Sequence, residues 1–258
     1  MMEILVVIAI IIVIAAIAFP VITGLRVRAN KAHALATMKS LGTAIGSYAA
    51  QNDGALPDED TPGKDGWTAA TEPAAAKAWY NALPKLLSSK GVGDFVRDGT
   101  EAAFYSRESV LFLPGAQYPE VKKKQKPLFA IAINTKIHRK SIDGEKVAMK
   151  LQNVQLPART VIFLEQGLPG ERPKAHDTMS GKDYDGAPKG SAKSFVARYN
   201  KRGIITFLDG HAEEVSGKDL LTGAGDIVWD EKLSETNPSA IFWTADPKQD
   251  PNKKAVSK

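Results

Sequence analysis

An unbroken run of nineteen apolar residues near the start of the chain, residues 4–22 (ILVVIAIIIVIAAIAFPVI), constrains this protein more than any other feature. As a helix the run is about 28 Å long, close to the roughly 30 Å hydrocarbon core of a bilayer. A backbone surrounded by lipid must satisfy its own hydrogen bonds, so we predict that this segment is helical.

Three interpretations fit the run. A cleaved signal peptide would use the small residues Ala16 and Ala18, but no basic segment precedes the run and the apolar residues continue beyond them. The second interpretation is a single-span anchor, and the third is a helix that also packs against copies of itself. Glu3, the ionisable residue at the head of the run, favours the third because a carboxylate near lipid needs a positive partner. An acidic residue at a helix N-terminus is also stabilised by the helix dipole alone.

Met1-Met2-Glu3-Ile4, the apolar run and Pro20 resemble the start of the mature chain in type IV pilins and type II secretion pseudopilins. The family's basic leader, its terminal Gly and the Phe-Thr pair are absent. We therefore expect the true start codon to lie upstream. A basic leader would also outweigh the positive charges that follow the run (Arg26, Arg28 and Lys31), and would place the head outside the cytoplasm.

The resemblance implies a filament subunit that a prepilin peptidase trims, that can be methylated, and that a pilus or secretion machine extracts from the membrane. Its partners would be copies of itself, that machinery and the membrane. Glu3 would neutralise the terminal amine of a neighbouring subunit, and Ile4 would begin the filament core. The sequence leaves open whether the filament is a pilus or a secretion pseudopilus, and whether the subunit is major or minor.

We expect the helix to continue beyond the membrane, with a local weakness at Pro20 and Gly24. A second, amphipathic half would end at the stop signal Asn52-Asp53-Gly54. Its predicted apolar stripe is Leu25, Ala32, Leu35, Met38, Leu41, Ile45 and Tyr48, opposite Arg28, Lys31, Lys39 and Thr43. Gly42 and Gly46 would permit close approach, either of a second helix or of a strand of the head.

The predicted fold class is α+β: the long helix packs against an antiparallel β-sheet head. A short helix is expected over residues 75–87, and strands over 128–134, 160–166 and 204–208. The expected division is a membrane and filament-core helix (1–24), its amphipathic continuation (25–54), a globular head (55–245) and a flexible tail (246–258).

Asp209-Gly210 predicts a type I′ hairpin between residues 204–208 and 211–215. Phe207-Leu208-Asp209-Gly210-His211 also resembles a C-terminal phrase of pilin-like proteins, in which a His precedes Asp-Gly by nine residues. Tyr199 stands at the place of that His, which weakens a metal-binding interpretation.

Composition and motifs point away from chemistry. The net charge is +5 without a basic stripe interleaved with aromatics, so no nucleic-acid partner is expected. The chain has no cysteine, no phosphate-binding glycine loop and no nucleophile elbow. His211, Asp209, Glu213 and Glu214 lack the further ligands that a catalytic zinc site needs. The candidate ion site is a calcium loop at Asp183 and Asp185, near Asp177, with Ala187 in place of a further carboxylate.

The sequence therefore predicts a non-enzymatic filament subunit, held in the cytoplasmic membrane with its head in the periplasm or outside the cell. No cofactor is expected apart from the candidate calcium ion. The alternative from another class is a singly anchored periplasmic enzyme or ligand-binding protein, for which a small-molecule pocket in the head would be evidence.

Overall fold

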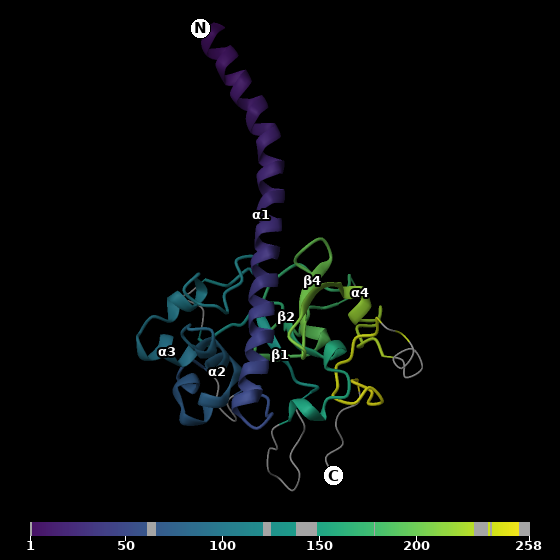
Figure 1. Cartoon of the computed structure of the whole chain (residues 1–258). Helices are drawn as coiled ribbons and strands as arrows, with labels where there is room; N and C mark the ends of the chain where they lie inside the picture. Colours follow the sequence, from purple (N-terminus) through teal and green to yellow (C-terminus); the bar gives the residue numbers. More distant parts are fainter. Residues whose placement is uncertain are drawn as a thin grey trace.

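A computed structural model describes residues 2–60, 66–120, 125–137, 149–177, 179–229, 237 and 239–252. The first helix, α1 (Met2–Gln51), is a single rod of 50 residues, about 75 Å long. Figure 1 shows the N-terminal half of α1 projecting from a globular head that packs against its C-terminal half.

The helix α1 continues without interruption through Pro20 and Gly24, and its projecting half curves away from the axis of the rest (Figure 1). It ends as predicted. The Gly54 N–H donates to the carbonyl of Ala49 at 2.8 Å, and Asp53 and Gly54 adopt positive φ angles of 51° and 80°. The Asn52 side chain also donates to the carbonyl of Tyr48 at 2.8 Å. Backbone groups left free at the helix end are thereby satisfied.

The buried face of α1 differs in part from the predicted stripe. Met38, Leu41, Ile45 and Tyr48 are buried, together with Ala34, Thr37, Ala44 and Ala49. Leu25, Ala32 and Leu35 are exposed. Several apolar residues of this helix recur at helical spacing on more than one face, so spacing alone could not choose the face on which the head packs.

The head contains a five-stranded sheet in the order β3-β1-β2-β4-β5. Its strands are β1 (Ile131–Asn134), β2 (Val161–Glu165), β3 (Lys189–Gly190), β4 (Arg202–Phe207) and β5 (Ala212–Ser216). The prediction of an antiparallel sheet is wrong at one edge, because β3 pairs with β1 in parallel. A strand of two residues carries no alternating pattern, so β3 could not be predicted from sequence periodicity. The layout is otherwise the expected α+β one.

The hairpin between β4 and β5 does not have the predicted type I′ turn. That turn requires positive φ at both central residues, but of Asp209 and Gly210 only Gly210 has one, at 94°. The Gly210 N–H donates to the Phe207 carbonyl and the Phe207 N–H to the His211 carbonyl. These bonds define a three-residue loop that ends in a glycine bulge.

A helical layer completes the head on the other side of α1 (Figure 1). The helix predicted over residues 75–87 is α2 (Trp79–Leu86), preceded by a 3-10 turn at Pro73–Lys77. The other described helical segments are α3 (Val92–Arg97) in this layer, α4 (Gly217–Leu220) beside the sheet, and short 3-10 turns at Thr68–Thr71, Glu101–Tyr105, Leu151–Asn153, Pro157–Arg159 and Ala192–Ser194.

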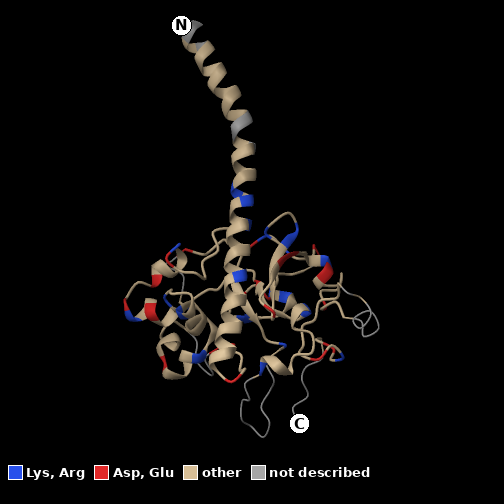
Figure 2. Cartoon of the chain, viewed as in Figure 1, with Lys and Arg blue, Asp and Glu red and all other residues tan. Residues whose placement is uncertain are grey.

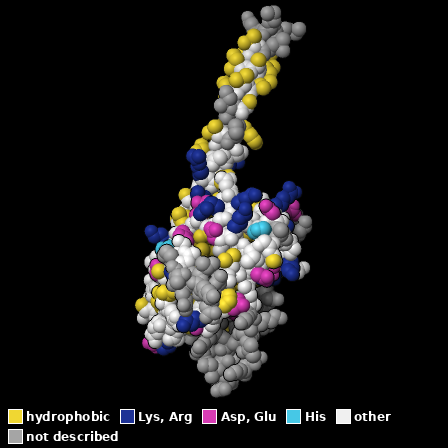
Figure 3. Space-filling view, turned by 90° about the vertical axis from the view of Figure 1, so that its right-hand side faces the viewer, with side chains coloured by type: hydrophobic (Ala, Val, Ile, Leu, Met, Phe, Trp, Pro, Cys, Tyr) yellow, Lys and Arg dark blue, Asp and Glu magenta, His cyan; other side chains and the backbone are white. Residues whose placement is uncertain are grey.

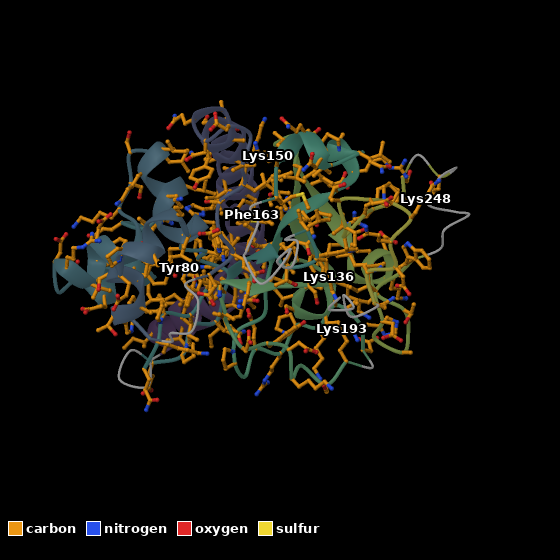
Figure 4. All side chains as sticks on the ribbon, turned by 90° about the horizontal axis from the view of Figure 1, so that it is seen from below. Tyr80, Lys136, Lys150, Phe163, Lys193 and Lys248 are labelled. Carbon is orange, nitrogen blue, oxygen red and sulfur yellow. The ribbon has the colours of Figure 1, made fainter. Side chains whose placement is uncertain are left out.

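Aromatic rings join the helical layer to the sheet. The ring centroid of Trp79 lies 5.1 Å from that of Phe163 and 5.8 Å from that of Phe129. Seen from below, Phe163 lies near the middle of the head and Tyr80 on its helical side (Figure 4). A second cluster of buried apolar side chains, which includes Leu164 and Phe195, is separate from the first. The strand β2 contributes side chains to both clusters, and all of its residues are buried.

The ordered head extends beyond the predicted boundary at residue 245. The side chain of Asn252 accepts from the Ile227 N–H and donates to the Ile227 carbonyl, both at 2.9 Å. Residues 246–252 therefore belong to the packed part of the chain.

Candidate functional site

The first candidate site is the projecting half of α1. The four consecutive side chains of Ile11, Ile12, Val13 and Ile14 are each 58–61% exposed. Successive helix residues are separated by about 100°, so four in a row cover the whole circumference. This half is apolar on every side, unlike an amphipathic helix with one buried stripe. Among the described helices, α1 is the one that is long and apolar enough to cross a membrane.

The predicted assembly residues lie along this projecting half. Ile4 is 65% exposed, and a side chain at Gly24 would meet no other atom within 4 Å. The side chains of Glu3 and Pro20 lie outside the described part of the chain. The docking role of Glu3 stays a prediction.

Gly42 and Gly46 have different surroundings. A Cβ atom at Gly42 would lie 2.6 Å from the carbonyl oxygen of Gly210 and 2.7 Å from a methyl carbon of Thr206. Gly42 thus lets the β4–β5 hairpin approach the helix, which is the strand alternative offered by the sequence. A Cβ atom at Gly46 would meet nothing within 4 Å apart from the adjacent backbone of α1.

The two parts of the C-terminal motif, Tyr199 and the segment 209–211, are far apart in the fold. Tyr199 precedes β4 and is buried, whereas Asp209, Gly210 and His211 form the turn that follows β4. The residues therefore sit at opposite ends of one strand and do not build a common site.

The turn itself is held by local contacts. The His211 Nδ1 atom lies 2.6 Å from Asp209 Oδ1, which also accepts the His211 N–H at 3.1 Å. The His211 ring stacks on Phe207 with centroids 4.3 Å apart. Both polar side chains are partly exposed. These contacts shape the hairpin.

The candidate calcium residues also lie in a turn. Asp185 Oδ1 accepts the Ala187 N–H at 2.9 Å, around Gly186 at a φ of 66°. Over the described ranges no three His, Asp or Glu side chains converge on a point where an ion could bind. Calcium binding by Asp183 and Asp185 stays an untested prediction.

A buried charged cluster that was not predicted from the sequence links three segments of the head. Arg198 donates from Nε and Nη2 to the two carboxylate oxygens of Glu171, both at 2.7 Å. Its Nη1 donates to Glu165 at 3.2 Å. Glu165 also accepts from the Tyr199 hydroxyl at 3.1 Å and from the Ile204 N–H at 2.9 Å. The three charged side chains are at most 2% exposed.

The electrostatics of this buried charged cluster are unbalanced, because two carboxylates share one guanidinium. Burial raises the pKa of the Glu165 carboxyl, and the Arg198 charge opposes that shift only in part. Burial, followed by the charge of Glu165, also raises the pKa of the Tyr199 hydroxyl. The one sign of this cluster in the sequence is the carboxylate that ends the apolar run VIFLE, because a buried charge needs a partner. Tyr199, at the position where a His was expected, thus belongs to this cluster as a hydrogen-bond donor to Glu165.

Comparisons of the chain with protein-family models, with curated proteins and with solved structures give no match.

Proposed function

We propose that this chain is a structural subunit of a type IV pilus or of a type II secretion pseudopilus. It would be stored in the membrane through the projecting half of α1 and later buried among the equivalent helices of other subunits. The observation that carries the proposal is the contrast within one helix. One half is exposed and apolar all round, while the other half belongs to the core of the head.

The projecting half is too apolar for water. Ile4, Ile12 and Phe19 are 65%, 61% and 73% exposed, so none of them gains from contact with the head. Such a surface can be removed from water either by lipid tails or by other apolar helices. The two environments correspond to the stored and the assembled states of the proposed subunit.

The absence of a break between the halves supports a filament over a simple tether. A tethered domain needs only a flexible connection, whereas α1 runs as one helix from the apolar rod into the core of the head. A continuous helix sets the direction of the head relative to the rod. Helices packed side by side in a filament would therefore hold their heads outside in a regular arrangement.

Glu3 provides the test of this proposal. In the precursor with its upstream leader, Glu3→Ala should abolish filaments sheared from cells, because the carboxylate no longer neutralises a neighbouring terminal amine. The head should stay folded and the protein should stay in the membrane fraction. Glu108→Ala removes an exposed carboxylate of the head and serves as the matched control, with filaments expected at the wild-type level.

Filaments that form equally well with Glu3→Ala would contradict the role of Glu3. If the leader-bearing wild-type protein forms no filament or pseudopilus at all, the chain is an anchored periplasmic protein instead.

A further inference from the structure

Basic side chains gather where α1 leaves the head. Figure 2 places Lys and Arg residues on α1 and on the adjoining head at this junction, and Figure 3 shows basic side chains below the apolar rod, with some acidic side chains among them. The basic collar, as we define it here, consists of Arg26, Arg28, Lys31, Arg107, Lys201 and Arg202.

Three members of the basic collar, Arg26, Arg28 and Lys31, belong to α1 itself. Arg26 and Arg28 are exposed and, along the described part of the chain, have no ion-pair partner. Two helix residues that are two positions apart point about 200° away from each other, so these side chains lie on opposite sides of α1. They follow the end of the apolar run by about 6 Å and 9 Å.

The other members bring the head to the same level. Lys31 Nζ lies 3.0 Å from a Glu214 oxygen, and Arg202 Nε lies 3.7 Å from the other oxygen of that carboxylate. The start of β4, with Arg202, and the preceding turn, with Lys201, are therefore next to the first turn of α1 inside the head. Lys201 is 77% exposed, and its partner Asp177 is 85% exposed.

Arg107 approaches from the helical layer of the head. The Arg107 side chain is exposed. The pKa of His33, two residues beyond Lys31 on α1, is lowered first by the burial of His33 and then by the charge of Arg107. Among the described residues, the ion pairs of the collar are those of Lys31 and Arg202 with Glu214 and of Lys201 with Asp177. Arg26, Arg28 and Arg107 keep their charge unpaired among the described residues.

The position of the collar matches the layer of lipid headgroups. Headgroups extend about 5–8 Å beyond the hydrocarbon core on each side. With residues 4–22 in the core, Arg26 lies at the level of the headgroups, Arg28 lies at their outer edge, and Lys31 lies about 14 Å from the core. The end of the head is thus within about one Debye length of the headgroups at physiological salt.

We infer that the basic collar docks the head onto anionic lipid headgroups while the subunit is stored in the membrane. The inference rests on the membrane storage proposed above and needs no filament. Docking would hold the head flat against the bilayer, and extraction into a filament would have to break these contacts.

The chain contains no cysteine, so single probes can be introduced cleanly. We would reconstitute the full-length protein in vesicles of phosphatidylcholine, with or without phosphatidylglycerol, and measure energy transfer to an acceptor on the lipid headgroups. A fluorophore on Gln117→Cys reports from the collar end, because Gln117 is exposed and lies close to Gly115, which contacts Asn30 of α1. A fluorophore on Gln51→Cys reports from the C-terminal end of α1, on the side of the head away from the collar.

Phosphatidylglycerol should increase energy transfer at position 117, and added salt should reverse the increase, while position 51 should show no increase. The paired variant Arg107→Gln with Lys201→Gln should remove this lipid dependence. Each basic residue near an anionic surface changes the docked-to-free ratio about fivefold, so two should change it roughly 25-fold. Lys77→Gln with Lys150→Gln is the control with the same charge change. Both residues are exposed and lie near the C-terminal end of α1.

Equal energy transfer in neutral and anionic vesicles, or an equal loss with the Lys77 and Lys150 pair, would overturn the inference. Flotation of the same vesicles separates it from the proposed function. Protein that floats without a lipid-dependent signal refutes docking alone, whereas protein that does not float refutes membrane storage as well.

Discussion

The two halves of α1 belong to one helix but meet different surroundings. In the head-bound half, Met38, Leu41 and Ile45 are fully buried against the sheet and α2. In the projecting half, residues of the same type, such as Ile12 and Ile14, are 61% exposed. The projecting half is therefore stabilised only by what surrounds the monomer, and the head-bound half is stabilised by the monomer itself. Substitutions in the two halves should change different properties.

The largest expected effect is in the buried charged cluster. Arg198→Met would leave Glu165 and Glu171 buried without a cation and should destabilise the head by about 3–5 kcal/mol. Urea unfolding of the full chain in detergent micelles, followed by fluorescence of buried Trp79 and Trp243, measures this change. Arg28→Met at the junction is the control and should leave the unfolding midpoint unchanged. A stable Arg198→Met variant would mean that the carboxylates are satisfied in another way.

The core side of α1 should give the next effect. Leu41→Ala removes a fully buried side chain and should cost about 2–5 kcal/mol of head stability. Ile12→Ala in the projecting half should change the same unfolding curve by no more than about 0.5 kcal/mol. Equal losses in the two variants would erase the distinction between the halves.

The two glycines of the head-bound half give a smaller contrast of opposite sign. Gly42→Ala places a methyl group against the Gly210 carbonyl and should destabilise the head by about 1–3 kcal/mol. Gly46→Ala faces open space and should stabilise the helix by up to about 1 kcal/mol. Thermal unfolding of both variants measures the difference, and destabilisation by Gly46→Ala would show that this face has a contact partner.

The smallest effect is a pH dependence inside the cluster. The folded pKa of Glu165 is raised above its ordinary value of 4.5, so the native state binds a proton more tightly than the unfolded state. Stability from this group is complete below pH 4.5 and is lost as the pH rises through the folded pKa. The loss has a slope of at most about 1.4 kcal/mol per pH unit.

Glu165→Gln should lack this loss, so the stability of the variant relative to wild type should increase with pH. Urea unfolding at a series of pH values measures the difference, with the exposed Glu108→Gln as the control. A difference that is flat between acidic and neutral pH would show that Glu165 is ionised in the native head throughout.

Much of the fold was predictable where the signal is local. The apolar run, the helix end at Asn52-Asp53-Gly54 and the strand at residues 160–166 depend on residues that are neighbours in the chain. The prediction was weaker where a partner decides the outcome. Leu35 and Ala34 are adjacent, yet only Ala34 faces the head. The position of the sheet, and not the helical period, made that choice.

The candidate sites divide in the same way. The projecting helix could be recognised from composition alone, because apolar residues on every side of a helix exclude water as a stable environment. The role of Tyr199 could not be recognised, because its partner Glu165 lies 34 residues earlier in the chain. Asp209 and Gly210 correctly indicated a hairpin, but the type I′ turn predicted from them is wrong, because only Gly210 has a positive φ angle.

Residues close together in the chain are enough to show that the N-terminal half of α1 must leave water and where α1 stops. Both properties depend on contacts within one helix and its capping turn. Contacts between distant segments, in contrast, decide which face of α1 is covered and how closely the hairpin approaches Gly42. They also bring Glu165, Glu171 and Arg198 together. Buried charges are tolerated only with partners that the fold brings from distant segments. The same fold carries Arg107 and Lys201 to the end of the head where α1 emerges.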